Sequence, residues 1–178
     1  SLMAHYAADL QEINNHISIE KLTKGNVCIQ FFAAWTNPVD KPNSYLESGL
    51  KLIDTYNNML DMYRHNLMPI LHYEDAVNAL HSEKIGCVLA VEGGEILEGE
   101  LANLNLLYEL GVRLMTLTWN YTNDLSSGIG DENNEDMGLS EFGRTVVYHM
   151  NKLGMLIDLS HISYRGFWDV CELSNMPV

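Results

Sequence analysis

The sequence predicts an α/β protein built on a parallel sheet, and three observations carry that prediction. Four apolar runs are rich in β-branched and aromatic residues, as buried strands are. Each run is followed by a segment whose apolar residues recur every three or four positions, which is the period of a helix facing a core. The two patterns alternate along the chain with no low-complexity segment between them. Such alternation is typical of parallel βαβ units and excludes a sandwich or a helical bundle.

The first half of the chain shows the pattern clearly. The first predicted strand, VCIQFFAAW at 27–35, is too continuously apolar for a half-exposed strand. A loop with two prolines follows it, and Asn43-Ser44 can cap a helix over 45–65. Pro69 then breaks the chain before a second helix over 73–82.

The second half repeats the alternation. Its predicted elements are a strand at 85–91, a helix at 101–110, a strand at 112–119, a helix from Ser140 to about 152, a strand at 155–160 and a helix near 163–174. We expect the four strands to lie parallel and adjacent in chain order, with the helices as crossovers.

Composition sets further bounds. A chain of 178 residues is long enough for one domain, which we place at 1–178. The net charge of −14 makes nucleic acid and anionic membranes poor partners, because like charges repel. No apolar stretch approaches the ~20 residues that span a bilayer. The three cysteines lie far apart without metal or redox spacing, so we expect a cytoplasmic protein.

Polar side chains stand at the ends of two predicted strands. Glu92 ends the strand at 85–91, and His161 follows the strand at 155–160. Ligands bind outside the carboxyl ends of parallel strands, and a carboxylate with an imidazole suits zinc. Gly93 and Gly94 would let a metal or substrate approach the backbone closely. Two less specific interpretations also fit these residues: a solvated turn glutamate and a packed or exposed histidine.

Longer stretches of the sequence carry a family resemblance. VEGGEIL, LYELGVRLMTLTWN and GLSEFGRTVVYHMNKLGMLIDLSH occur in this order. They resemble the membrane dipeptidase (renal dipeptidase) family of zinc peptidases, from about residue 16 to the last residue. The resemblance implies a parallel (β/α) barrel of the TIM-barrel type, two zinc ions, and hydrolysis of dipeptides, often with a D-residue at the carboxyl-terminal position. It also implies a homodimer.

The resemblance also implies roles for individual residues. Glu92, the glutamate of VEGG, would bridge the two metals, and His161, the histidine of DLSH, would ligate one of them. Two bridged metals can share a hydroxide and polarise the scissile carbonyl. Trp119 and Asn120 fall where the family contacts its substrate. The family often has a histidine at the position of Trp119, and an indole can donate a hydrogen bond but cannot accept a proton. Packing at the barrel mouth is an equally good interpretation of Trp119.

Parts of the family pattern are missing from these residues. The first zinc ligands of the family are a His-x-Asp pair, and residues 1–15 contain His5 but no such pair. The second metal histidine, and a later aspartate and arginine, would lie beyond Val178. A complete barrel needs roughly 250 residues. The sequence therefore predicts about the second to fifth strands of a barrel, and no catalytic acid or base is assignable in it.

Three interpretations of function follow. The first is a segment of a dinuclear zinc dipeptidase, inactive by itself because two protein ligands rarely hold zinc. The second is a non-catalytic barrel fragment that serves as a binding or scaffold module. The third is another metallohydrolase on the same barrel, acting on phosphoesters or cyclic amides. Basic residues at strand ends would favour a phosphate substrate, and the sequence places none there.

Overall fold

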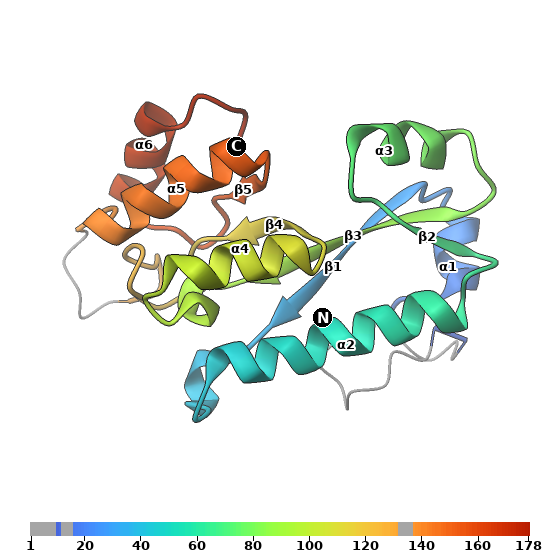
Figure 1. The fold of residues 1–178 in the computed structure, drawn as a ribbon, viewed down its shortest axis with the longest axis horizontal. Coiled ribbons are helices and arrows are strands. Elements are labelled where there is room, and N and C mark those ends of the chain that lie inside the picture. The colour runs from blue at the N-terminus through green and yellow to red at the C-terminus, as the bar shows by residue number, and fades with distance from the viewer. Residues whose placement is uncertain (1–9, 12–15, 132–136) are drawn as a thin grey trace.

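The computed structural model describes residues 10–11, 16–131 and 137–178. Helices and strands alternate along these residues, as the ribbon in Figure 1 shows. The elements are α1 (Ile19–Lys24), β1 (Ile29–Trp35), the short 3-10 helix η1 (Pro38–Asp40), α2 (Tyr45–Met62), β2 (Leu67–Pro69), α3 (Tyr73–Leu80), β3 (Ile85–Glu92), the 3-10 helix η2 (Gly94–Leu97), α4 (Leu101–Glu109), β4 (Val112–Thr116), α5 (Glu141–Leu153), β5 (Leu156–Asp158) and α6 (Tyr164–Leu173).

One parallel sheet organises the described residues. Its strand order is β1-β3-β4-β5, and every neighbouring pair is parallel. The predicted α/β class and the order of the four strands are therefore confirmed. A fifth strand, β2, was not predicted; it pairs with the beginning of β3, on the edge that β4 occupies further along. It is three residues long and ends at Pro69, so its sequence carries too little pattern to be recognised.

Serine caps explain where three of the helices begin. The hydroxyl oxygens of Ser44, Ser140 and Ser163 accept hydrogen bonds from the backbone N–H groups of the first turns of α2, α5 and α6. The helices predicted from sequence period begin and end within three residues of those in the structure. Helix α1 and the two 3-10 helices were not predicted.

The sheet has two different faces. On the first face, Tyr56 of α2 packs against Phe32 with ring centroids 6.0 Å apart, and its hydroxyl donates to the carbonyl of Cys87 at 2.9 Å. This face forms the main core with α2, α4 and α5. Its buried strand residues are Phe32, Ala34, Cys87, Leu89, Val91, Met115 and Ile157.

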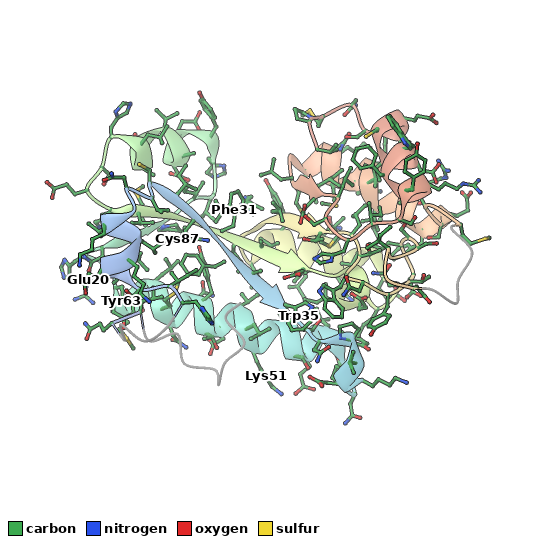
Figure 2. All side chains as sticks on the ribbon, turned by 180° about the vertical axis from the view of Figure 1, so that it is seen from behind. Glu20, Phe31, Trp35, Lys51, Tyr63 and Cys87 are labelled. Carbon is green, nitrogen blue, oxygen red and sulfur yellow. The ribbon has the colours of Figure 1, made fainter. Side chains whose placement is uncertain are left out.

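The second face is covered only in part. Helix α3 packs on it near the start of β3, where Ala79 and Ile70 contact Val88. Further along, Phe31 and Leu156 are 44% and 46% exposed. Figure 2 shows Trp35 at the end of β1, with Phe31 further back along the same strand. No helix in the described part of the chain has the length and apolar character needed to cross a membrane.

Candidate active site

A row of four side chains crosses the sheet at the carboxyl ends of its strands. Trp35 of β1 is in register with Glu92 of β3, Glu92 with Thr116 of β4, and Thr116 with Asp158 of β5. Residues in register across parallel strands point to the same face, so these four side chains all lie on the second face. The candidate site is built on this row.

Glu92 and His161 meet at this edge of the sheet. Oε1 of Glu92 lies 3.6 Å from Nε2 of His161, and the two side chains are 27% and 35% exposed. This distance is too long for a hydrogen bond. The structure therefore brings together the two residues that the sequence singled out, and both side chains are partly exposed.

Asn120 fixes the orientation of the His161 ring. Its side-chain oxygen lies 2.9 Å from Nδ1 of His161. A carbonyl oxygen can only accept a hydrogen bond, so Nδ1 carries the proton in this contact and Nε2 keeps its lone pair in the neutral ring. Nε2 is the ring nitrogen that lies 3.6 Å from Oε1 of Glu92. Asn120 was predicted to contact substrate, and in this structure its side-chain oxygen contacts His161.

Asp158 shapes the turn that presents His161. One carboxylate oxygen accepts from the N–H and the hydroxyl of Ser160, at 3.1 and 2.8 Å, and the other accepts from the hydroxyl of Thr116 at 2.5 Å. Burial alone raises the pKa of Asp158, but these hydrogen bonds outweigh it and the pKa is lowered. Asp158 is thus ionised at neutral pH. The turn places His161 at φ +65°, a left-handed conformation that is uncommon for residues other than glycine.

Trp119 sits in an aromatic cluster beside the pair. Its ring centroid is 5.1 Å from that of Trp35, 5.6 Å from Tyr121 and 6.2 Å from His161. The indole, near the start of the loop after β4, therefore packs among the rings of Trp35, Tyr121 and His161. Trp119 lies near His161, as predicted, and this contact fits the packing interpretation and the substrate interpretation equally.

The two glycines after Glu92 make room for protein atoms. Gly93, at φ +100°, lies against the Glu95 carboxylate, and any side-chain carbon on it would collide with that group. A side-chain carbon on Gly94 would collide with Leu125 and with the carbonyl oxygen of Leu117. The chain's own residues fill the space where a side chain would lie, which explains why both positions are glycine. That a metal or substrate approaches their backbone stays a prediction.

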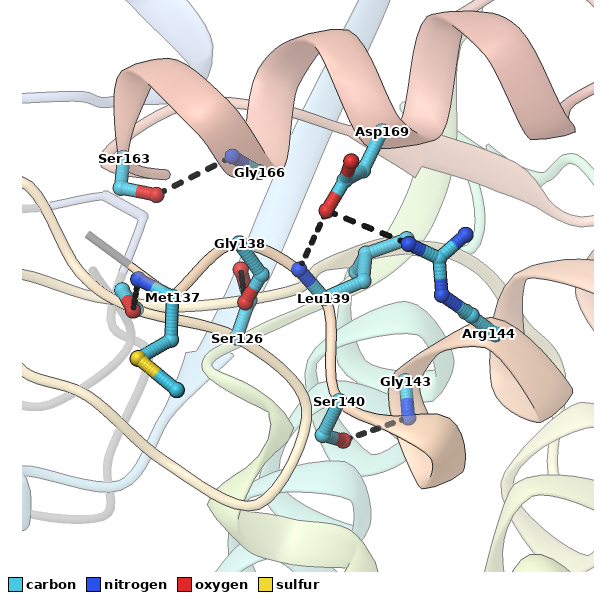
Figure 3. Close-up of polar contacts among 11 residues, drawn as sticks. Ser126, Met137, Gly138, Leu139, Ser140, Gly143, Arg144, Ser163, Gly166 and Asp169 are labelled. Carbon is cyan, nitrogen blue, oxygen red and sulfur yellow. Dashed lines mark hydrogen bonds and ion pairs between the residues drawn. The ribbon is translucent and has the colours of Figure 1, made fainter.

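The long loop between β4 and α5 is tied to the last helices. The Asp169 carboxylate of α6 accepts from the backbone N–H of Leu139 at 2.9 Å and pairs with Arg144 of α5 at 3.5 Å (Figure 3). The hydroxyl of Ser126 donates to the carbonyl of Gly138 at 3.0 Å. These contacts hold the loop that carries Trp119 and Asn120 at its start.

The site has two metal-type donors rather than a complete set. Among the described residues no three His, Cys, Asp or Glu side chains come together in a way that could hold an ion. Sequence reasoning missed Trp35, Thr116 and Asp158, which complete the row around Glu92 and His161. Their shared position at the ends of neighbouring strands would identify them, but only when the strand register is known.

Comparison with known proteins identifies the family. A sequence profile described as membrane dipeptidase, peptidase family M19, matches residues 2–178. The chain belongs to the membrane dipeptidase family. It is 32% identical over 178 residues to an uncharacterised dipeptidase of Schizosaccharomyces pombe, a match that covers 93% of this chain and 43% of the relative. The resemblance inferred from the three motif blocks is thereby confirmed.

Solved structures of a probable dipeptidase and of a metallopeptidase share the fold. The probable dipeptidase PvdM of Pseudomonas aeruginosa matches with a TM-score of 0.85 at 19% identity, over 95% of this chain and 46% of that one. A metallopeptidase of Rhodobacter sphaeroides, liganded with a phosphinate mimic of the dipeptide L-Ala-D-Ala, matches with a TM-score of 0.79 at 21% identity, over 93% and 55%. The chain thus spans about half the length of the relatives it matches.

Proposed function

We propose that Glu92 and His161 are two of the ligands of a dinuclear zinc centre. The centre would belong to a dipeptidase that hydrolyses the peptide bond of dipeptides. The observation that carries the proposal is the approach of Glu92 Oε1 to His161 Nε2, 3.6 Å apart at the carboxyl edge of a parallel sheet. Membership of a metallopeptidase family supports it. The remaining metal ligands would come from other parts of the complete protein.

The geometry of the pair fits zinc. Ligand atoms about 2.0–2.2 Å from a tetrahedral zinc ion lie roughly 3.4 Å from one another. The two facing atoms stand at nearly this separation, and the Nε2 lone pair is oriented by the contact of Nδ1 with Asn120. Glu92 would hold both ions through its two oxygens, and His161 would ligate one of them.

The chain's own residues have separable tasks in this proposal. A bound zinc pair supplies a water of lowered pKa and a polarised carbonyl. Glu92 would hold the ions and would offset part of their charge. His161 is positioned by Asn120 and by the turn that Asp158 organises. Trp119 shields one side of the centre from water and can donate one hydrogen bond to a bound dipeptide.

The substrate class follows from the family and from one relative. The Rhodobacter sphaeroides protein was solved with a mimic of L-Ala-D-Ala. We therefore propose dipeptides as substrates, including those with a D-residue at the carboxyl-terminal position. A homodimer and a cytoplasmic location remain predictions from the sequence.

The test is dipeptide hydrolysis by the full-length gene product with added zinc. We expect release of alanine from L-Ala-D-Ala, and a loss of more than about a hundredfold in Glu92→Gln and in His161→Ala, because each removes a metal ligand. Glu100→Gln is the matched control, since Glu100 is exposed and lies outside the row. Full turnover in Glu92→Gln would refute the proposal.

The 178 residues by themselves should behave differently. With two converging donors they should bind zinc weakly and hydrolyse no dipeptide, because zinc sites normally use three or four protein ligands. The alternative, a non-catalytic binding or scaffold module, predicts the same inactivity in the full-length protein. The full-length assay therefore separates the two functions.

A further inference from the structure

We propose that Gly128 is a positioning residue for His161, because it lets the loop of residues 120–130 close as a clamp on that histidine. The loop holds His161 at two points: the ring through the side chain of Asn120, and the backbone through the N–H of Ile129. The inference rests on the proposed zinc centre and adds to it a glycine that supplies no ligand. The backbone hydrogen bonds of the loop and the packing of Gly128 carry it.

The end of the loop pairs antiparallel with the turn that carries His161. The N–H of Ile129 donates to the carbonyl oxygen of His161 at 2.8 Å. Two residues further on, the N–H of Ser163 donates to the carbonyl oxygen of Ser127 at 3.0 Å. His161 has φ +65°, and an L-residue keeps such a conformation only where the surrounding structure holds it. These backbone contacts therefore fix the histidine in a conformation that it would not adopt by itself.

The beginning of the same loop holds the ring. The side-chain oxygen of Asn120 lies 2.9 Å from Nδ1 of His161, and the backbone carbonyl of Asn120 accepts from the N–H of Gly130 at 2.9 Å. The second of these contacts joins the two ends of the loop into one closed unit. A shift of either end therefore moves one of the two contacts to His161.

Gly128 lies where the two ends of the clamp touch. A side-chain carbon on it would stand 2.6 Å from the carbonyl carbon and the carbonyl oxygen of Asn120, and 2.6 Å from the carbonyl carbon of Tyr121. Carbon atoms in contact lie about 3.5–4.0 Å apart, and backbone atoms cannot rotate out of the way. Gly128 does not have the positive φ that favours glycine, so this position requires glycine for space alone.

An added methyl group at Gly128 must therefore separate the segment that holds the backbone of His161 from the residue that holds its ring. The ring then loses the acceptor at Nδ1 and can rotate, or carry its proton on Nε2, the nitrogen that would bind zinc. Loss of the outer partner of a metal-bound histidine usually lowers metal affinity about 10–100-fold. We expect a loss of this size from Gly128→Ala.

The test begins with the zinc-free full-length gene product. Isotope-labelled histidine and proton–nitrogen correlation spectra show which ring nitrogen carries the proton, and His161→Gln identifies the signal of His161. We expect the neutral ring of the parent to carry its proton on Nδ1, because the Asn120 oxygen can only accept. In Gly128→Ala a second form with the proton on Nε2 should appear. A glycine that only supported stability would leave the tautomer unchanged.

Zinc affinity, measured by competition against a chromogenic chelator, gives the second readout. Gly128→Ala should lose about 10–100-fold. Gly154→Ala is the control: Gly154 has φ +69° and no described atom within 4 Å, so alanine there strains the backbone without touching the loop. It should lower the melting temperature and leave zinc affinity unchanged. Gly128→Ala combined with Asn120→Ala should lose less than the product of the two separate losses, because both changes act on one contact.

Several results would overturn the inference. One is a parent ring that carries its proton on Nε2, and another is a Gly128→Ala ring with the parent spectrum. Equal zinc affinities in Gly128→Ala and Gly154→Ala, or a double variant that loses the full product, would also overturn it.

Two further outcomes are decided by the same spectra. Thermal unfolding shows whether Gly128→Ala is folded. If it is not, Gly130→Ala replaces it, because a side-chain carbon there would meet Cβ of Asn120 less closely, at 3.0 Å; an unchanged spectrum in that variant would overturn the inference. If the parent binds no zinc, the proposed function fails, and the spectra of the zinc-free protein still decide whether Gly128 positions His161.

Discussion

Asn120 is the residue whose contact decides which nitrogen of His161 faces Glu92. Replacing Asn120 with alanine removes the oxygen at 2.9 Å from Nδ1 and frees the ring to rotate or to change tautomer. We expect zinc affinity of the full-length protein to fall about 10–100-fold, the usual effect of losing the partner of a metal-bound histidine. Competition against a chromogenic chelator measures this affinity.

A conservative variant separates positioning from simple loss of stability. Asn120→Asp keeps an oxygen that accepts from Nδ1, so it should retain more zinc affinity than Asn120→Ala. Asn58→Ala, on the exposed face of α2, is the control and should match the parent protein. Equal affinities in Asn120→Ala and the parent would show that the contact does not position His161.

Glu95 should make stability depend on pH in a defined direction. Because burial raises its pKa in the folded state, the native protein holds the proton more tightly than the unfolded chain does. Below the ordinary carboxyl pKa the group is neutral in both states and costs nothing. As the pH rises from there through the raised pKa, the folded state must carry a buried charge and stability falls.

The Glu95→Gln variant tests this pH dependence of stability. The melting temperature of Glu95→Gln should equal that of the parent at low pH and should exceed it increasingly toward neutral pH. Thermal unfolding from pH 4 to pH 8 measures the difference. Glu100→Gln, a change of the same kind at an exposed residue, should show no such trend. A difference that shrinks as the pH rises would mean that Glu95 is stabilised as a carboxylate.

Among the elements, the loop between β4 and α5 depends on one side chain of α6. Asp169 is 16% exposed and joins the Leu139 N–H to Arg144. Asp169→Ala leaves that N–H without its acceptor, so we expect a loss of about 1–3 kcal/mol in the free energy of unfolding. Urea unfolding measures it, with Glu172→Ala, an exposed change on the same helix, as control. Equal midpoints for the two variants would show that the loop is held by other contacts.

Strands and helices were predictable where the sequence shows a long apolar pattern or a recognisable helix cap. The strand β3 and the helix α5 were found because a buried apolar run and a serine cap are both visible in sequence. The strand β2 was missed because three residues carry no period. The contact between Asp158 and Thr116 joins residues 42 positions apart, and it depends on strand register, which a single sequence does not reveal.

The candidate site was predictable only where its residues carry a signal in the sequence itself. Glu92 and His161 were found because strand ends and family motifs mark them. The contact of Asn120 with Nδ1 of His161 was not predicted, because nothing in the sequence shows that the two atoms lie together. A contact of Asn120 with substrate stays a prediction. The filling of the space beside Gly93 by Glu95 likewise depends on how the turn folds back.

For the molecule as a whole, the second face of the sheet leaves apolar surface uncovered. Phe31 and Leu156 are large, apolar and close to half exposed. The 178 residues, expressed alone, should therefore self-associate through this face or through free strand edges. Phe31→Ser should reduce the association seen by light scattering, whereas Tyr73→Ser, at an exposed position on α3, should not. A monomer at high concentration would contradict this prediction.

The central claim is that Glu92 and His161 bind zinc together. Anomalous diffraction at the zinc edge, from crystals of the full-length gene product, tests it most directly. We expect a zinc ion about 2.0–2.2 Å from both a carboxylate oxygen of Glu92 and Nε2 of His161, with a second ion on the other oxygen of Glu92. A zinc-loaded protein in which neither residue touches an ion would contradict the claim.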